Sequence, residues 1–266
     1  PKWFEGCFRV NKIIATSNHA KYALEKTTYP MIHNPTGQQF IGRVETPIEV
    51  VGYPVRLFES KLMDLQLEQN FNFLVVAQWG PRKNIEQTLK WFYDEFYEKN
   101  VGLVLKIQTV ANCRMDREFT QLRLKNLLQQ LDATKVGKTR KCSIQFLHGD
   151  LFEEEMTYVY NHPKIKALLS LSFGEGFGLP IFEAVYNGLP VIAPAWSGQT
   201  DFIYVPVKDK KNKGQTRESC MVSNVSYNIR NVQPEALVPD MIIAESQWCF
   251  PVEYSAKQRM REDHRK

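Results

Sequence analysis

The chain has 266 residues, of which 43% are hydrophobic and 24% are charged, and its formal net charge at pH 7 is +5. This composition is ordinary for a soluble globular protein with an apolar core, and the length suggests one complete domain plus part of another. The densest basic run, Lys208 to Lys213, contains no aromatic residue. A nucleic-acid surface would combine a basic face with stacking aromatics, so we interpret this run as a solvated loop and expect no nucleic-acid partner.

The five cysteines are odd in number and widely spaced, and no C-x-x-C pair occurs. This pattern favours reduced thiols in a cytoplasmic compartment over a disulfide framework or a zinc site. No apolar stretch approaches the roughly 18 residues of a membrane span, and no signal peptide heads the sequence. The chain opens on Pro1-Lys2-Trp3 without an initiator Met, so we expect its natural start to lie upstream.

Residues 1–60 differ from the rest of the chain. Ser17 is placed to cap a short helix over residues 18–24, and a β-rich piece follows at residues 47–52. The region looks too short and too punctuated to bury a core of its own. We therefore expect it to be the tail of a preceding domain followed by a linker.

From residue 71 onward, short apolar runs alternate with amphipathic segments. The pattern predicts strands at residues 72–77, 102–107, 143–147, 167–172 and 190–193. It predicts helices after Gly80-Pro81 (with Ile85, Leu89, Phe92 and Phe96 on one face), and at residues 116–131, 152–160 and 179–186. Such alternation implies a doubly wound α/β domain, a parallel sheet with helices on both faces. Ligands bind such sheets at the carboxyl ends of the strands.

The end of the chain breaks this pattern. Residues 205–226 read as a polar, hairpin-like excursion, and the chain from Trp248 onward contains Pro251 followed by a charged, helical tail.

The most informative stretch is residues 172–184 (SFGEGFGLPIFEA), where a buried strand leads into a helix. Glycines at 174, 176 and 178 allow the backbone to approach a ligand closely. The helix start behind them presents free N–H groups and a positive dipole end, which together suit a phosphate.

Two common phosphate motifs are absent from the sequence. A G-x-G-x-x-G fingerprint would require glycine at Leu179, and the Gly-Lys-Thr at residues 137–139 would require glycine at Asp132 to form a P-loop.

Two carboxylates, Glu175 in this loop and Glu183 in the following helix, stand eight residues apart. A carboxylate beside a phosphate loop suits a vicinal diol, such as paired sugar hydroxyls, because it can accept two hydrogen bonds. The alternative is a solvent-facing Glu175 and a Glu183 that serves only the helix start. The residues by themselves leave both interpretations open.

The segment Glu-Gly-Phe-Gly-Leu-Pro at residues 175–180, followed by Glu183, resembles the E-x7-E signature of glycosyltransferase family 4 and its relatives, which share the two-domain GT-B fold. Residues 187–193 (NGLPVIA) fit the next strand of that family, and residues 77–84 (AQWGPRKN) resemble the loop after the first strand of its donor domain. The resemblance covers about residues 13–260. It implies a nucleotide-sugar-binding Rossmann-like domain at residues 61–245 with a helical tail at 246–266. Residues 1–60 would then be the tail of the N-terminal acceptor domain plus the linker, making the chain an N-terminally truncated GT-B protein.

The resemblance also implies roles for individual residues. Glu175 would lie beside the donor sugar, Glu183 would bind the ribose hydroxyls, and Lys83 would hold the diphosphate leaving group. Glu175 and Lys83 are therefore the candidate catalytic residues. Contacts with the sugar and the diphosphate fall to Gly176, Phe177, Gly178 and Leu179.

One position departs from the family pattern. The family usually has an arginine five residues before the lysine, and here that position is Gln78. Arg82 is near enough to supply the charge from another direction; alternatively, Gln78 only donates a hydrogen bond and Lys83 works with less help. A third interpretation is that Arg82 and Lys83 are simply exposed cations at the start of the helix. It is unfavourable because cations are destabilising at a helix N-terminus that lacks an anion.

Two further polar positions follow strands. His148 comes after the third strand, near the place where the nucleobase packs in the family, although a lone histidine is more often structural. Asp201 follows the fifth strand where relatives usually carry Glu, and its role is left open.

These features predict a glycosyltransferase that moves a sugar from a nucleoside-diphosphate donor to a hydroxyl of a carbohydrate, lipid-linked or other acceptor. By resemblance, the reaction retains the anomeric configuration and needs no metal and no cofactor. Peripheral membrane contact through the N-terminal domain is left open. The alternatives are a nucleotide-sugar epimerase of similar fold and a fragment that binds the nucleotide sugar without transferring it.

Overall fold

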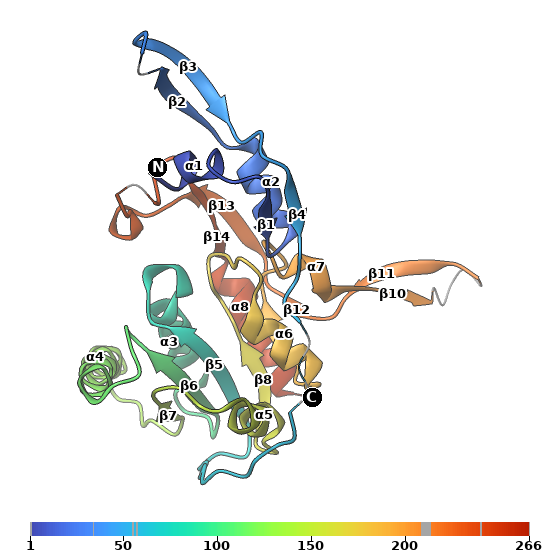
Figure 1. Cartoon of the computed structure of the whole chain (residues 1–266). Helices are drawn as coiled ribbons and strands as arrows, with labels where there is room; N and C mark the ends of the chain where they lie inside the picture. The colour runs from blue at the N-terminus through green and yellow to red at the C-terminus, as the bar shows by residue number, and fades with distance from the viewer. Residues whose placement is uncertain are drawn as a thin grey trace.

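The computed structural model describes residues 2–33, 35–54, 56, 58–208, 214–239 and 241–265. Its centre is a six-stranded parallel sheet with the strand order β12-β9-β8-β5-β6-β7 (Figure 1). These strands are β5 (Asn72–Gln78), β6 (Gly102–Gln108), β7 (Ser143–Leu147), β8 (Ile165–Leu169), β9 (Val191–Ala193) and β12 (Ser223–Asn224). The parallel α/β fold predicted from the sequence is confirmed.

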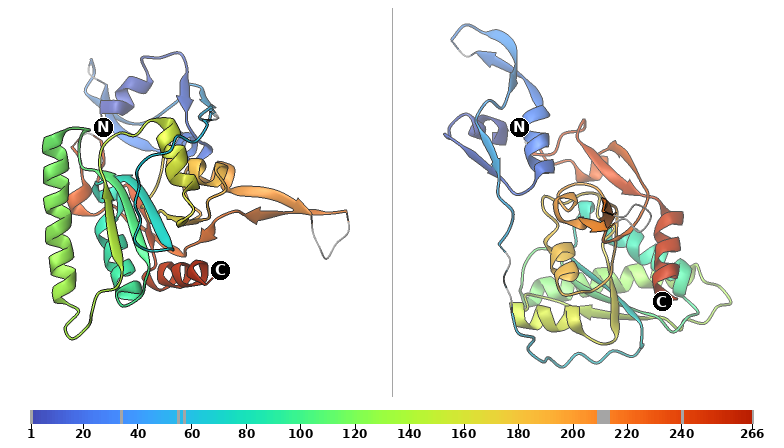
Figure 2. Two further views of the ribbon diagram at one scale, coloured as in Figure 1. Left: turned by 90° about the horizontal axis from the view of Figure 1, so that it is seen from below. Right: turned by 90° about the vertical axis from the view of Figure 1, so that its right-hand side faces the viewer.

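Helices cover both faces of this sheet (Figure 2). One apolar cluster lies against α3 (Ile85–Phe96), α4 (Arg114–Ala133) and α8 (Glu253–His264), and the other against α5 (Glu153–Asn161) and α6 (Leu179–Tyr186). Along β5, Phe73 and Val75 belong to the first cluster and Leu74 to the second. Because successive side chains of a strand point to opposite faces, a continuous apolar run becomes buried on both sides. All four residues proposed for the inner face of α3 are buried.

Two parts of the sheet differ from the prediction. The fourth strand was expected to reach residue 172, but β8 ends at Leu169. Beyond it, the Leu171 carbonyl accepts a hydrogen bond from the side-chain amide of Asn84, and the Phe173 N–H donates a hydrogen bond to the Arg82 carbonyl. These residues therefore bond to the loop after β5 in place of a neighbouring strand. The sixth strand, β12, has only two residues and was missed inside the segment interpreted as an excursion.

The N-terminal region consists of short elements that form one small unit. These are α1 (Lys2–Cys7), β1 (Ile13–Ala15), α2 (Asn18–Lys26), β2 (Thr28–His33), β3 (Gln38–Arg43) and β4 (Ile48–Val50). β1 pairs with β4 in parallel, and β2 and β3 form an antiparallel hairpin. The expectation that this region buries no core is wrong, because Phe4, Cys7, Ala15, Val44 and Ile48 form an apolar cluster. Ser17 caps α2 as predicted, by accepting a hydrogen bond from the Ala20 N–H at 3.1 Å.

The last part of the chain carries two antiparallel hairpins. After α7 (Thr200–Ile203), β10 (Tyr204–Lys208) and β11 (Thr216–Cys220) form the predicted hairpin, which projects from the body (Figure 1). Residues 209–213 of the basic run lie outside the described residues. A second hairpin of β13 (Tyr227–Asn231) and β14 (Gln247–Pro251) was not predicted, and it flanks the 3-10 helix η2 (Pro234–Ala236). Helix α8 buries Ala256 and Met260 in the first apolar cluster.

All five cysteines are free thiols. Across the residues that the structure describes, no helix is both long and apolar enough to cross a membrane.

Candidate active site

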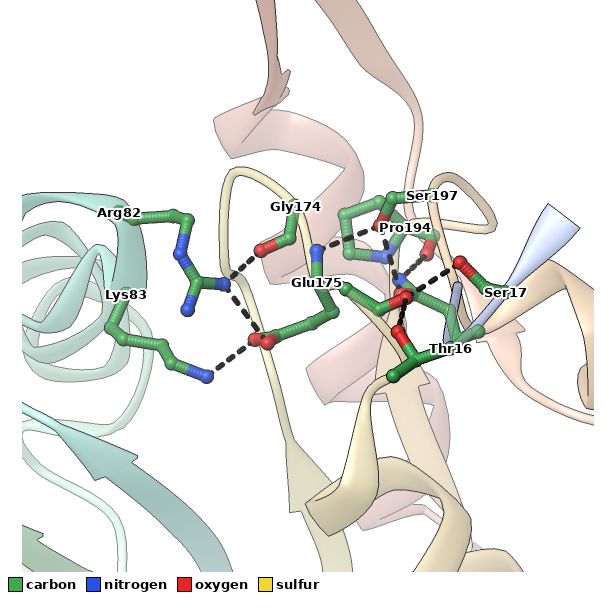
Figure 3. Close-up of polar contacts among 10 residues, drawn as sticks. Thr16, Ser17, Arg82, Lys83, Gly174, Glu175, Pro194 and Ser197 are labelled. Atoms are coloured by element: carbon green, nitrogen blue, oxygen red, sulfur yellow. Dashed lines mark hydrogen bonds and ion pairs between the residues drawn. The ribbon is translucent and has the colours of Figure 1, made fainter. Parts of the chain in front are cut away.

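Three loops at the carboxyl edge of the sheet meet at one place (Figure 3). They follow β5, β8 and β9, and the first contains the 3-10 helix η1 (Pro81–Lys83). The Phe173 N–H donates to the Arg82 carbonyl and joins the first loop to the second. The Gly198 N–H donates to the Glu175 carbonyl at 2.9 Å and joins the second to the third. The three loops that the sequence analysis singled out are therefore brought together by the strand order.

A charge cluster of Arg82, Lys83 and Glu175 forms the centre of this place. Lys83 Nζ lies 2.6 Å from Glu175 Oε1, and an Arg82 guanidinium nitrogen lies 2.9 Å from Glu175 Oε2. The same nitrogen donates to the Gly174 carbonyl. The Glu175 and Lys83 side chains are only 9% and 16% exposed. The interpretation as exposed cations is therefore wrong for Lys83, whereas the Arg82 side chain is 40% exposed; both are paired with a nearly buried carboxylate.

The charge cluster changes the proton affinity of its members. Burial by itself raises the pKa of Glu175, but the charges and hydrogen bonds of Lys83 and Arg82 outweigh it, and the pKa lies below its ordinary value. Burial lowers the pKa of Lys83, and the adjacent Glu175 opposes this only in part. Glu175 is consequently ionised at neutral pH and holds two cations at the edge of the sheet.

The third loop clamps the backbone of Glu175 on both sides. Ser197 Oγ accepts a hydrogen bond from the Glu175 N–H at 2.8 Å, while the Gly198 N–H satisfies the Glu175 carbonyl. Ser197 is 2% exposed and has φ of 71°, a left-handed conformation that costs a non-glycine residue energy. Its hydroxyl also donates to Gln199 at 3.0 Å. This role of Ser197 was not predicted from the sequence.

The glycines of the loop are required by contacts within the chain. Gly178 has φ of 95° and stands at the N-cap of α6, where a left-handed residue starts the helix. A Cβ on Gly198 would lie 2.1 Å from the Gly176 carbonyl oxygen, so these two backbone segments pack directly on each other. The close approach of Gly198 to Gly176 was not predicted, and the approach of Gly174, Gly176 and Gly178 to a ligand stays a prediction.

The N-terminal unit also reaches this loop. Ser17 Oγ donates to the Gly176 carbonyl at 2.6 Å, and Thr16 Oγ1 donates to the same oxygen at 3.3 Å (Figure 3). Asp201, whose role was left open, accepts a hydrogen bond from the Asn18 N–H at 2.8 Å. These contacts join residues about 160 to 183 positions apart, which no local sequence signal reports.

Glu183 lies one helical turn past the loop, in a different environment. Its Oε2 accepts a hydrogen bond from the Tyr160 hydroxyl at 2.8 Å. Burial raises the pKa of Glu183, and the bond from Tyr160 opposes this only in part. Glu183 and Leu179 line a cavity of about 440 Å³ between α5, α6 and the connection that follows β4, which we call the α5–α6 cavity.

Gln78 lies on the other side of the charge cluster. Its side-chain amide donates to the Thr109 carbonyl at 3.1 Å. Gln78, Arg82 and Lys83 line a second cavity of about 240 Å³ together with Trp248. Arg82 thus occupies the same surroundings as Gln78, in keeping with the hypothesis that it supplies the charge missing at that position.

His148 has a structural partner. Its Nε2 lies 2.8 Å from Asp116 Oδ2, and its side chain is only 4% exposed. The Asp116 carboxylate also accepts hydrogen bonds from the N–H groups of Thr109 and Val110, and so fixes the turn before α4. The His148 side chain is therefore committed to this turn, and a contact with a nucleobase would have to come from the main chain nearby.

No family model matches the sequence, and no match was found among curated proteins. Solved structures do match. A trehalose-6-phosphate synthase has 12% identity, covers 76% of this chain and 49% of its own, and has a TM-score of 0.51. The sucrose-phosphate synthase of Thermosynechococcus elongatus has 19% identity, with 72% and 42% covered and a TM-score of 0.50. The UDP-forming α,α-trehalose-phosphate synthase of Burkholderia xenovorans, in complex with glucose-6-phosphate, has 9% identity, with 76% and 51% covered and a TM-score of 0.50.

The chain spans about half the length of the structures it matches. At these identities the similarity shows the fold alone. It agrees with the GT-B type of α/β fold expected from the sequence.

Proposed function

We propose that this chain binds a nucleoside-diphosphate sugar and belongs to a glycosyltransferase that moves the sugar to an acceptor hydroxyl. The observation that carries the proposal is the charge cluster at the carboxyl ends of β5 and β8. There, two cations and a carboxylate converge directly before the N-terminus of α6. Doubly wound sheets bind their ligands at this edge, and helix N-termini favour phosphate groups.

The cations have a specific task in such a reaction. As the bond between the sugar and the diphosphate breaks, negative charge develops on the departing diphosphate. Lys83 and Arg82 are held in place before the donor arrives, so they stabilise that charge with little reorganisation. Without donor, Glu175 neutralises them; with donor, they are shared between the carboxylate and the diphosphate.

The remaining roles in this proposal come from the family resemblance, and the arrangement around α6 supports them. Glu175 lies beside the donor sugar, and the backbone from Gly176 to Leu179 contacts the sugar and the diphosphate. Glu183, one turn further along the helix, accepts hydrogen bonds from the ribose hydroxyls. Gln78 borders the same cation site, and the main chain around His148 contributes to the base end.

The finer assignment is part of this proposal. The E-x7-E spacing of Glu175 and Glu183 supports a family 4-like enzyme, and with it retention of the anomeric configuration. The two cations support transfer without a metal, since they already supply positive charge to the diphosphate. The structurally similar proteins are named as synthases of phosphorylated sugars, which supports a carbohydrate acceptor.

An experiment on the protein separates this function from its two alternatives. A panel of nucleoside-diphosphate sugars is incubated with and without candidate acceptors, with and without excess chelator, and products are resolved by mass spectrometry. We expect acceptor-dependent release of nucleoside diphosphate that survives the chelator. Interconversion of the donor sugar without release would indicate an epimerase, and binding without turnover on any acceptor would indicate a binding module. Loss of activity in chelator, restored by Mg²⁺ or Mn²⁺, would contradict the leaving-group account.

A further inference from the structure

Two hydroxyl groups of the N-terminal unit hold one carbonyl of the glycine loop. Ser17 Oγ donates to the Gly176 carbonyl at 2.6 Å and Thr16 Oγ1 donates to the same oxygen at 3.3 Å, and we call these two side chains the hydroxyl pair. A carbonyl oxygen has two lone pairs, so the hydroxyl pair uses its full accepting capacity. Ser17 is completely buried and also accepts a hydrogen bond from the Ala20 N–H, so its single hydroxyl proton is directed at the loop.

Two neighbouring contacts keep the hydroxyl pair at this position. The backbone N–H and the side-chain amide of Asn18 both donate to Asp201 Oδ2, at 2.8 and 3.2 Å. The ring of His19 meets Trp196 edge-on, with 4.7 Å between the ring centroids. Both partners belong to the chain that follows β9, which also clamps the backbone of Glu175. The N-terminal unit is therefore fixed to the second and third loops of the site together.

The hydroxyl pair sets the direction of a backbone N–H. A trans peptide unit is planar, so the Gly176 carbonyl and the Phe177 N–H point in opposite directions. Figure 3 shows the hydroxyl pair on one side of Glu175 and the cations Arg82 and Lys83 on the other. Because the carbonyl is turned toward the N-terminal unit, the Phe177 N–H points toward the side of the cations.

This N–H is a donor that the protein itself leaves unused. No residue that the structure describes accepts a hydrogen bond from the N–H of Gly176, Phe177 or Gly178. Phe177 and Gly178 are buried residues, and buried N–H groups of folded proteins are nearly always paired. The three donors stand directly before the N-terminus of α6, where an anion is favoured. Glycine at 176 tolerates many backbone conformations, so the orientation of its peptide depends on the partners of the carbonyl.

We propose that Thr16 and Ser17 are positioning residues, which hold the Gly176–Phe177 peptide so that the Phe177 N–H faces the diphosphate of the donor. This inference rests on the proposed function and extends it to the N-terminal unit. Without the two hydroxyls the peptide is free to rotate, and a carbonyl oxygen in place of the N–H would repel the departing diphosphate. The N-terminal unit thereby acts on the rate of transfer without supplying a catalytic residue.

The test removes the hydroxyls while sparing the N-terminal unit. Ser17→Gly keeps a residue that caps helices nearly as well as serine, and Thr16→Val keeps the shape of threonine. The double variant should lose about ten- to a hundredfold in turnover and bind inorganic pyrophosphate several-fold more weakly by calorimetry. Thr16→Ser, which retains the hydroxyl, should stay within about twofold in both. The matched control is Thr27→Val, which removes a hydroxyl bond to the Ala23 carbonyl inside the N-terminal unit and should change neither.

The outcomes separate this inference from the function beneath it. If the unaltered protein transfers sugar and the folded double variant keeps turnover and pyrophosphate affinity within twofold, the positioning role is wrong and the proposed function stands. A lower melting temperature with unchanged pyrophosphate affinity would make the hydroxyls purely structural, and an equal loss in Thr27→Val would likewise overturn the inference. If the unaltered protein binds neither pyrophosphate nor any nucleoside diphosphate, the proposed function itself fails.

Discussion

The charge cluster precedes the N-terminus of α6 and the α5–α6 cavity extends along the same helix, yet the two are built in opposite ways. At the cluster, both carboxylate oxygens of Glu175 and both of its backbone polar groups have partners. In the cavity, Glu183 Oε2 accepts from the Tyr160 hydroxyl, whereas Glu183 Oε1 has no hydrogen-bond partner among the residues that the structure describes. A group that stabilises developing charge works best when it is fixed beforehand, whereas a group that binds a ground-state ligand needs an open position. Under the proposed function, we therefore expect the cluster (the turnover end of the donor site) to act mainly on rate and the cavity (its affinity end) to act mainly on binding.

The largest expected effect tests the turnover end through Lys83. Lys83→Met keeps most of the apolar stem and removes the charge. Loss of one such fixed stabilising group typically lowers turnover by about 10²–10³. Donor affinity, measured by calorimetry on the same variant, should fall much less, because the diphosphate charge grows only as the bond breaks. Arg82→Ala should show a milder loss, unless Arg82 has taken over the role of the arginine missing at Gln78, in which case the two losses should be comparable.

Lys90→Met, at an exposed position of α3, is the control for this experiment and should leave both turnover and donor affinity unchanged. A folded Lys83→Met enzyme that turns over within about threefold of the unaltered one would show that the cluster is a structural ion pair only.

The next effect concerns the clamp on the loop. In Gly198→Ala, the new Cβ would lie 2.1 Å from the Gly176 carbonyl oxygen and 2.8 Å from Phe177 Cα. Both neighbours are backbone, so the glycine loop must shift. A displacement of about 1 Å can cost about 10²-fold in rate, and forcing extra volume into a packed site costs about 1–3 kcal/mol of stability. Steady-state kinetics and thermal unfolding measure the two losses.

Gly6→Ala provides the comparison, since a Cβ there meets nothing within 4 Å. Normal turnover in Gly198→Ala would show that the position of Glu175 does not depend on this loop.

A third, intermediate effect tests the affinity end. Glu183→Ala removes a charged acceptor from the ribose diol, and such a loss typically costs about 1.5–3 kcal/mol. Nucleotide binding should therefore weaken by roughly ten- to a hundredfold. Glu153→Ala, which removes another carboxylate lining the same cavity, should stay within about threefold. Equal affinities of the Glu183 and Glu153 variants would return Glu183 to a structural role as the partner of Tyr160.

The elements around the proposed donor site also differ in how far the sequence could predict them. Helix α6 was predicted with its observed bounds, and β5 to within one residue, because apolar periodicity and the Leu179-Pro180 start are local signals. Glu175 and Lys83 were placed together because the carboxyl ends of parallel strands share one edge. The left-handed Ser197 and the bonds from Thr16 and Ser17 to Gly176 were not predictable, since they depend on packing between distant segments. Strand β12 was missed because two residues carry no periodicity.

The smallest expected effect is a pH dependence that belongs to the affinity end alone. Burial raises the pKa of Glu183, so this carboxyl takes up its proton at a higher pH than a free glutamate, whose value is 4.5. Only the ionised form accepts both hydrogen bonds of a diol, so nucleotide affinity should fall several-fold as the pH drops from 7 toward 4.5. The loss should begin above 4.5, because the folded pKa lies above that value. Glu175 behaves oppositely, since its pKa is lowered and it stays charged throughout this window. Calorimetric titrations of the unaltered protein and of Glu183→Gln separate this change from protonation of the nucleotide, which affects both proteins equally. If the two proteins lose affinity in parallel, Glu183 does not titrate against the ligand; a steeper loss in the unaltered protein ties the affinity of the cavity to this one carboxylate.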